Sequence, residues 1–258
     1  MVVEWTEVPG YKGCSWNPVS GCDRISEGCK YCWAKRVAET RLKGRFGYDE
    51  ENPFKVTLHW DRLEEPRGWK KPRACFVVDM GDLFHDSVPY DFITSVFDSM
   101  ICAPHHLFFV LTKRAKRMAD YLNERNEWFV GPRLNHVWFG VTAENQERAD
   151  ERIPELLNIP SRNLFVSVEP LLGHIKLDKY LPYEGIHSEP TVAWVIVGGE
   201  SGKHCRIMMP DWVRYLRAEC RLAKVPFYFK QWGGWPDQKE RGKAVLDGET
   251  YKEFPRWR

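Results

Sequence analysis

The sequence predicts an α/β fold, a single domain built as a partial (β/α)6 barrel of the TIM type. Short apolar runs recur along the chain, and amphipathic segments with helical spacing lie between them. The runs are nearly continuous, which is typical of parallel strands covered on both faces. Polar residues follow almost every run, as they do at the carboxyl ends of barrel strands.

Seven apolar segments carry the strand prediction, and the first lies near Tyr11–Ser15. The others are Ala74–Val78, Leu107–Leu111, Val137–Val141, Leu164–Val168, Val192–Val197 and Pro226–Phe229. Strands that alternate with helices form βαβ units and therefore a parallel sheet. About six or seven repeats in one domain favour a full or partial barrel over a doubly wound sheet.

Five amphipathic segments are predicted as helices: Trp33–Leu42, Tyr90–Met100, Ala115–Leu122, Ala143–Leu157 and Asp211–Ala223. The last has the clearest pattern, because apolar residues recur on one face from Val213 to Ala223. We expect Asp91 to cap the second helix and Pro154 to kink or split the fourth.

Composition is that of an ordinary globular chain, with 43% hydrophobic and 29% charged residues. Its 38 basic residues nearly balance the 36 acidic ones, so the net charge of +2 favours no class of partner. We expect one domain over residues 1–258, with a core of 12–235 and a peripheral tail at 236–258. There is no apolar leader after Met1 and no run of about 18 apolar residues, so we expect a cytoplasmic location and no membrane contact.

The cysteines carry the strongest functional signal. Cys22, Cys29 and Cys32 lie within eleven residues, and no fourth Cys or His follows closely. In a reducing compartment such a group favours a metal site over disulfides. A structural zinc site needs four ligands, whereas three thiolates leave one iron of a four-iron cluster open. The spacing favours an open iron–sulfur cluster, with zinc and buried free thiols as the alternatives.

Polar residues at the predicted strand ends form the second signal. Because these ends meet at one edge of a parallel sheet, the residues predict a lined pocket. The competing interpretation, that polar residues merely end strands, accounts for one or two positions. A structural ion pair of Glu169 with Lys113 or Lys230 is equally compatible with the sequence. The strand-end groups are Asp79–His85, Thr112–Arg114, Thr142–Asn145, Glu169–Pro170, Gly198–Gly202 and Lys230–Gly233.

Eight segments between residues 12 and 235 form a specific set of motifs: Ser15–Cys22, Ser26–Ala34, Gly81–His85, Leu111–Arg114, Val137–Asn145, Ser167–Gly173, Trp194–Gly202 and Phe229–Gly233. In order and spacing they resemble the motifs of the phage Gp37/Gp68 family, a domain of unknown function in the radical S-adenosylmethionine (SAM) superfamily. The C-x6-C-x2-C spacing is the family's own form.

The resemblance implies a [4Fe-4S] cluster on Cys22, Cys29 and Cys32, SAM at the open iron, and reductive cleavage to a 5′-deoxyadenosyl radical that abstracts hydrogen from a substrate. For SAM, it implies Tyr31 beside the adenine and the loop after the second strand at the methionine amino group. The SAM-binding residues expected on this basis are Tyr31, Asp79, Gly81, Asp82, Thr142 and Glu144, the last two at the ribose.

The remaining strand-end residues are expected to serve the substrate: Lys113, Arg114, Glu169, Glu200, Lys230 and Gln231. Cys205, a thiol outside the family pattern, is a candidate hydrogen donor to a product radical. Expected partners are SAM, an electron donor such as flavodoxin or ferredoxin, and a nucleoside or nucleic acid. The resemblance itself supplies no established substrate.

A second hypothesis, from a different class, is a zinc- or cluster-bearing nucleic-acid-binding protein without catalysis. It would contact phosphates through the basic stretches Arg67–Arg73 and Lys113–Arg117. Each stretch is also compatible with an ordinary solvated face.

Overall fold

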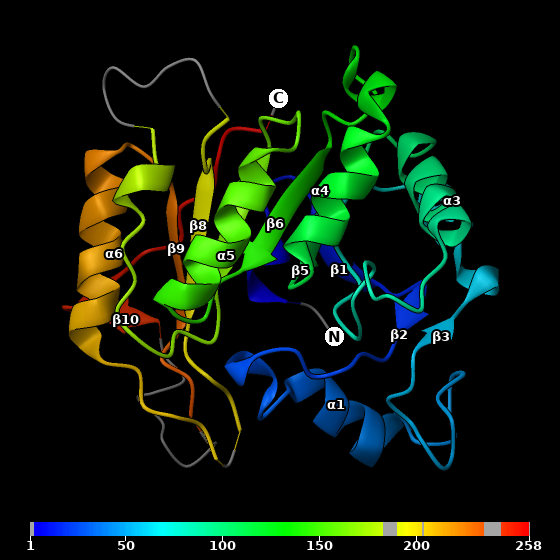
Figure 1. The fold of residues 1–258 in the computed structure, drawn as a ribbon, viewed down its shortest axis with the longest axis horizontal. Coiled ribbons are helices and arrows are strands. Elements are labelled where there is room, and N and C mark those ends of the chain that lie inside the picture. The colour runs from blue at the N-terminus through cyan, green and yellow to red at the C-terminus, as the bar shows by residue number, and fades with distance from the viewer. Residues whose placement is uncertain (1–2, 183–189, 203, 235–243, 258) are drawn as a thin grey trace. The chain divides into compact units, whose positions relative to one another are not determined.

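The structure is a computed structural model that describes residues 3–182, 190–202, 204–234 and 244–257. The chain divides into two compact units, residues 1–138 and 139–257. The boundary falls inside strand β6 (Val137–Thr142). The helices and strands carry the labels of Figure 1.

Three parallel strands organise the first unit: β1 (Lys12–Trp16), β4 (Arg73–Val77) and β5 (Leu107–Thr112). In β5 five of the six residues are buried, as the continuous apolar run predicted. A short antiparallel pair, β2 (Val19–Ser20) and β3 (Thr57–Leu58), follows β1 and lies beside the loop that carries the cysteines (Figure 1).

Four helices complete the first unit. They are α1 (Trp33–Val37), which continues as a π turn over Ala38–Leu42, α2 (Glu65–Gly68), α3 (Tyr90–Ile101) and α4 (Ala115–Asn123). The expectation that Asp91 caps α3 is wrong. The helix begins at Tyr90 and Pro89 holds the cap position, so Asp91 lies in the first turn, where its charge favours the helix dipole instead.

The second unit continues from β6 with β7 (Leu164–Val168), β8 (Trp194–Gly198) and β9 (Phe227–Gln231), all in parallel register. Its helices are α5 (Gln146–Leu157) and α6 (Pro210–Leu222). The described part of the connection from β7 to β8 holds only a 3-10 turn, Asp178–Tyr180.

Helix α5 differs from its prediction in where it begins and in how it accommodates Pro154. It starts later than expected, because Asn145 stays extended and its Oδ1 accepts from Arg148 N at 2.9 Å. The expected split at Pro154 is wrong, since the helix runs unbroken to Leu157. Pro154 lies in the last turn, so the hydrogen bond that it removes is near a terminus.

The described part of the C-terminal segment contacts the second unit. Phe229 N donates to Tyr251 O at 2.8 Å, and Trp194 Nε1 donates to Glu253 O at 3.0 Å. A small hairpin of β10 (Val245–Leu246) and β11 (Glu249–Thr250) precedes these contacts. The tail therefore covers residues of β8 and β9.

The predicted fold class is confirmed. The seven-stranded sheet has the order β1-β4-β5-β6-β7-β8-β9, in which every strand follows its neighbour along the chain. Parallel strands in sequential order, joined mainly by helical crossovers, are those of a partial (β/α) barrel. Among the described residues, no helix has the length and apolar character needed to cross a membrane.

Candidate functional site

The cysteine loop of the first unit begins where β1 and β2 end, and backbone contacts fix its start. Gly21 N donates to Met80 O at 2.9 Å, and Cys22 N donates to Phe54 O at 3.2 Å. Gly21 has φ +84°, and a Cβ there would lie 2.1 Å from Lys55 O. Only glycine allows this approach, which places Cys22 beside the loop that follows β4.

The other two cysteines are placed by the helix that follows them. Cys29 ends a 3-10 turn, and its Sγ lies 3.8 Å from Ser26 Oγ. Cys32 is the N-cap of α1, with its Sγ accepting from Lys35 N at 3.5 Å. All three thiols are free and half-buried. The three thiols are therefore accessible candidate metal ligands on one short loop.

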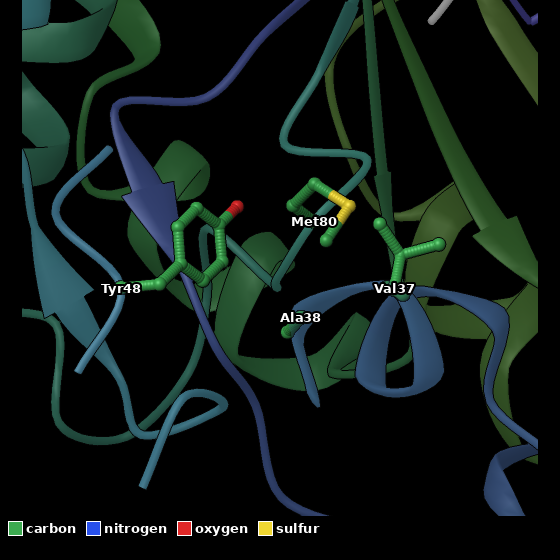
Figure 2. Packing of buried hydrophobic residues seen from close by; sticks show 5 residues of the cluster. Val37, Ala38, Tyr48 and Met80 are labelled. Carbon is green, nitrogen blue, oxygen red and sulfur yellow. The ribbon is translucent and has the colours of Figure 1, made fainter. Parts of the chain in front are cut away.

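A small hydrophobic cluster anchors this helix. Val37 and Ala38 from its inner face pack with Tyr48 and with Met80, which comes from the loop after β4 (Figure 2). Cys32 is partly buried against the same cluster. The apolar face of α1 thus fixes the position of the last cysteine relative to the end of β4.

A buried carboxylate and a guanidinium stand beside the first cysteine. Arg114 Nη1 donates to Cys22 Sγ and to Asp82 Oδ2, both at 3.3 Å. Asp82 also accepts from Thr112 Oγ1 at 2.6 Å and from Phe84 N at 3.0 Å. Asp82 is 5% exposed, so these donors fix its orientation. The carboxylate in turn holds Arg114 against the sulfur.

The charges around the loop act differently on two of its thiols. Burial, with a contribution from the Asp82 charge, raises the pKa of Cys22 to about 11, although Arg114 opposes the shift. Burial also raises the pKa of Cys29, but the Lys113 charge and hydrogen bonds around Ile25 and Ser26 outweigh it, and the net shift is downward. Lys113 and Arg114 thus supply positive charge beside two of the sulfurs.

Asp79, one of the residues expected at SAM, contacts the end of the first strand. Its two carboxylate oxygens accept from Ser15 Oγ at 2.8 Å and from Asn17 Nδ2 at 2.6 Å. Asn17 Oδ1 accepts from Met80 N at 3.0 Å, which closes a ring of contacts. Burial raises the pKa of Asp79. The network joins the carboxyl ends of β1 and β4.

Sequence reasoning assigned no role to His85, Ser15 or Asn17, although all three lie in segments that carry the family resemblance. His85 Nε2 lies 3.1 Å from Asp23 Oδ2, next to Cys22 in the chain, and His85 itself is buried. Arg117 donates to the carbonyls of His85 and Val88. The presence of these three residues in the motifs could have marked them as functional. Their contacts could not be predicted, because most of their partners are distant in the sequence.

The second unit has a buried ion pair at the end of β6. Glu144 Oε2 accepts from Arg152 Nη1 at 2.9 Å, and the same nitrogen donates to Thr142 O at 2.8 Å. Both Glu144 and Arg152 are almost fully buried. Arg152, on α5, was not predicted. It ties the two expected ribose-binding residues to the helix that follows them.

The expected substrate residues of the second unit are also paired. Lys230 Nζ donates to Glu169 Oε1 at 2.5 Å, so of the two partners that the sequence offered for Glu169 the structure pairs it with Lys230. Arg206 holds Glu200 through two nitrogens, with Nε to Oε2 at 2.9 Å and Nη2 to Oε1 at 2.5 Å. Gln231 Nε2 donates to Gly199 O at 2.8 Å.

Cys205 and Tyr31 complete the set of expected site residues. Cys205 is half-buried and donates its backbone N–H to Gly202 O at 3.2 Å. Tyr31 is half-buried between two of the loop cysteines, and the Lys30 ammonium lies 5.2 Å from its ring centre. Gly81 forms a parallel bridge with Gly21, where the two loops meet.

The sequence allowed two kinds of metal site on the three cysteines of this loop, an open iron–sulfur cluster and a zinc site. In the described part of the chain, no three His, Cys, Asp or Glu side chains gather closely enough to hold one ion. A structural zinc site requires such a gathering of four. Each thiolate of an iron–sulfur cluster binds a different iron. Cys22, Cys29 and Cys32 supply three free thiols of the type that a cluster uses, with Arg114 on the first sulfur and the Lys113 charge acting on Cys29.

Comparison with known families gives a match over nearly the whole chain. The family described as "Protein of unknown function (DUF5131)" matches residues 2–255. The chain belongs to the DUF5131 family. The Gp37/Gp68 name is not tested by this match and stays a prediction.

Other comparisons add little to the DUF5131 assignment. No curated protein matches the chain. Among solved structures, a mutant of spore photoproduct lyase is similar, with 11% sequence identity and a TM-score of 0.46. The similarity covers 84% of this chain and 62% of that one, so this chain spans less than two thirds of that structure.

Proposed function

We propose that this DUF5131 protein is a radical SAM enzyme whose cluster is held by Cys22, Cys29 and Cys32. The observation that carries the proposal is the loop itself: three free, half-buried thiols at the carboxyl end of a parallel strand, with Arg114 on the first sulfur. When bound, a [4Fe-4S] cluster with one open iron supplies the electron that cleaves SAM to a 5′-deoxyadenosyl radical.

The residues around the loop perform the supporting tasks. Lys113 and Arg114 offset the negative charge that three thiolates bring together. Asp82 fixes the direction of Arg114. Asp79 joins β1 to the loop after β4 through Ser15 and Asn17, so that both loops keep one geometry.

Three more groups are assigned by the same proposal. Tyr31 serves the adenine of SAM, and Thr142 and Glu144 serve its ribose. Glu169, Glu200, Lys230 and Gln231 orient the substrate, whose class we propose to be a nucleoside or nucleic acid, and Cys205 is the candidate hydrogen donor. The ion pairs Glu169–Lys230 and Glu200–Arg206 support an orienting role, because each presents two opposite charges at a strand end.

The basic stretch Lys113–Arg117 gives little support to phosphate contact. Arg114 binds Asp82, Lys116 binds Asp120 at 2.8 Å, and Arg117 donates to backbone carbonyls. These cations act within the first unit. The contacts of this stretch therefore do not favour the non-catalytic nucleic-acid-binding hypothesis.

The test is anaerobic purification followed by metal and sulfide analysis and incubation with dithionite and SAM. We expect about four irons and four sulfides per chain, and slow release of 5′-deoxyadenosine and methionine without substrate. Replacing Cys22, Cys29 or Cys32 by Ala should abolish iron binding, whereas Cys220→Ala should retain it, since Cys220 is buried in α6. A protein that holds zinc instead of iron, or that never cleaves SAM with its cluster intact, would refute the proposal.

A further inference from the structure

Two cysteines outside the cysteine loop, Cys14 and Cys75, lie against each other in the first unit. Cys14 in β1 and Cys75 in β4 are directly opposite in the parallel register. Their sulfur atoms are 2.6 Å apart. Neighbouring strands lie about 4.8 Å apart, which is within the Cα separation of about 4.4–6.8 Å that disulfides span. The register and the sulfur separation are therefore compatible with a bond between the two sulfurs.

The surroundings give the two thiols different reactivity. The hydrogen bond with Cys75 lowers the pKa of Cys14 despite burial, and the charges of Arg73 and Lys12 add to the effect. Lys12 and Arg73 are themselves opposite each other in the register, two residues before the cysteine pair. Burial raises the pKa of Cys75. The surroundings therefore favour the thiolate form at Cys14 more than at Cys75.

We propose that Cys14 and Cys75 are a redox pair that forms a disulfide between β1 and β4 on exposure to hydrogen peroxide. The Cys14 thiolate attacks one peroxide oxygen, so that an S–O bond forms, the O–O bond breaks and hydroxide leaves. The Cys75 sulfur then attacks Cys14, the S–O bond breaks, and the hydroxyl group leaves with the Cys75 proton as water. The two cysteines lose two electrons, and peroxide gains them.

The position of the pair gives the bond a consequence. The strands β1 and β4 lead into the cysteine loop and into the loop of Asp79 and Asp82. A covalent link between them would resist separation of these two loops during unfolding. The proposal does not depend on the proposed function, because neither residue is assigned to the cluster or to SAM.

Peptide mapping of the folded protein tests the bond. Trypsin places Cys14 in peptide 13–24 with Cys22, and Cys75 in peptide 74–113 with Cys102. The full chain with Cys22→Ser and Cys102→Ala therefore leaves one thiol in each peptide. After peroxide treatment and alkylation under denaturing conditions, we expect one cross-linked species joining 13–24 to 74–113, which dithiothreitol separates. Alkylated free thiols, or sulfinic and sulfonic acids alone, would overturn the proposal.

Thermal unfolding gives a second readout in the otherwise unchanged chain. Peroxide should raise the melting temperature on the order of 10 °C, reversibly with dithiothreitol, because the bond closes a long loop. Cys75→Ala should lose this rise, and Cys220→Ala should keep it, since Cys220 is equally buried but outside the pair. An equal rise in Cys75→Ala would contradict the assignment even if the doubly substituted chain failed to fold.

Discussion

At the scale of single residues, the first unit relies on a few side chains that serve others. Asp82 holds Arg114, and Arg114 contacts the sulfur of Cys22. Asp79 holds Ser15 and Asn17. None of these contacts involves neighbours in sequence. Each contact positions another side chain. Its loss should therefore alter the properties of the cysteine loop without removing the loop itself.

Arg114→Gln should lower the reduction potential of the reconstituted cluster. The guanidinium stabilises the more negative, reduced state, and a charge-assisted hydrogen bond of about 1.4 kcal/mol corresponds to about 60 mV for one electron. Potentiometric titration followed by electron paramagnetic resonance measures the shift. Arg114→Lys, which keeps the charge, should shift the potential less. Identical potentials in Arg114→Gln and the unchanged protein would show that the contact with Cys22 has no electrostatic role.

At the scale of elements, α1 and the strand ends decide where the cysteines lie. The helix is only five residues long, so its own hydrogen bonds contribute little stability. Its position depends on packing against Met80 and Tyr48. Removal of that packing should therefore affect the loop as well as the stability.

Met80→Ala should lower the free energy of unfolding by about 2–5 kcal/mol, the usual cost of a buried Met→Ala substitution. It should also weaken iron retention, because Cys32 rests on the same cluster. Denaturant unfolding and iron release to a chelator measure the two effects. The matched control is Met208→Ala, a methionine of the second unit that is 5% exposed against 6% for Met80. If both variants release iron equally, the anchoring role of Met80 is wrong.

Two buried imidazoles before β5 and β6 should make the protein sensitive to acid. Burial lowers the pKa of His106 and of His136 below 6.5. Below pH 6.5 the unfolded chain therefore binds protons that the folded chain does not, and stability falls as the pH falls toward the folded values. The slope should reach at most about 1.4 kcal/mol per pH unit for each imidazole.

The measurement is denaturant unfolding between pH 7 and pH 5. His136→Gln should reduce the slope, because Gln can still donate to Met100 O, as His136 Nε2 does at 2.8 Å, without titrating. A variant with the slope of the unchanged protein would mean that other groups cause the acid sensitivity.

At the scale of the whole molecule, two groups of charged residues lie in different units. The cysteine loop, Asp79, Asp82 and Arg114 belong to residues 1–138, and the pairs of Glu169 and Glu200 belong to residues 139–257. The proposed cofactor and substrate roles should therefore be separable by substitution.

Glu200→Gln should leave the iron content and the slow cleavage of SAM without substrate within about twofold of the unchanged protein. Glu200 is 4% exposed at the side chain and accepts charge-assisted hydrogen bonds from Arg206, which is 32% exposed, so the loss of its charge should lower the free energy of unfolding by about 1–3 kcal/mol. Asp82→Ala should reduce the same cleavage at least tenfold, because the carboxylate that orients Arg114 is lost. Iron content and 5′-deoxyadenosine release measure both. Equal losses in the two variants would end this division of roles.

The strands of the main sheet could be predicted from the sequence, because burial patterns are local, whereas the short pairs β2–β3 and β10–β11 and helix α2 were not predicted. The seven sheet strands lie within one or two residues of the predicted segments, and the triad of Cys22, Cys29 and Cys32 is visible as spacing alone. Both signals need only residues that are neighbours in the chain. The late start of α5 is an exception that the Asn145 cap explains.

Only the tertiary structure decided which side chains meet. Side-chain contacts join residues that are far apart in the sequence: Asp79 and Ser15 are separated by 64 residues, Arg114 and Cys22 by 92, and Cys14 and Cys75 by 61. These encounters depend on which strands are adjacent and in what register, and a shift of one residue would turn each side chain to the other face. A sequence pattern determines the faces of a strand, whereas the contacts across strands exist only once the sheet has formed.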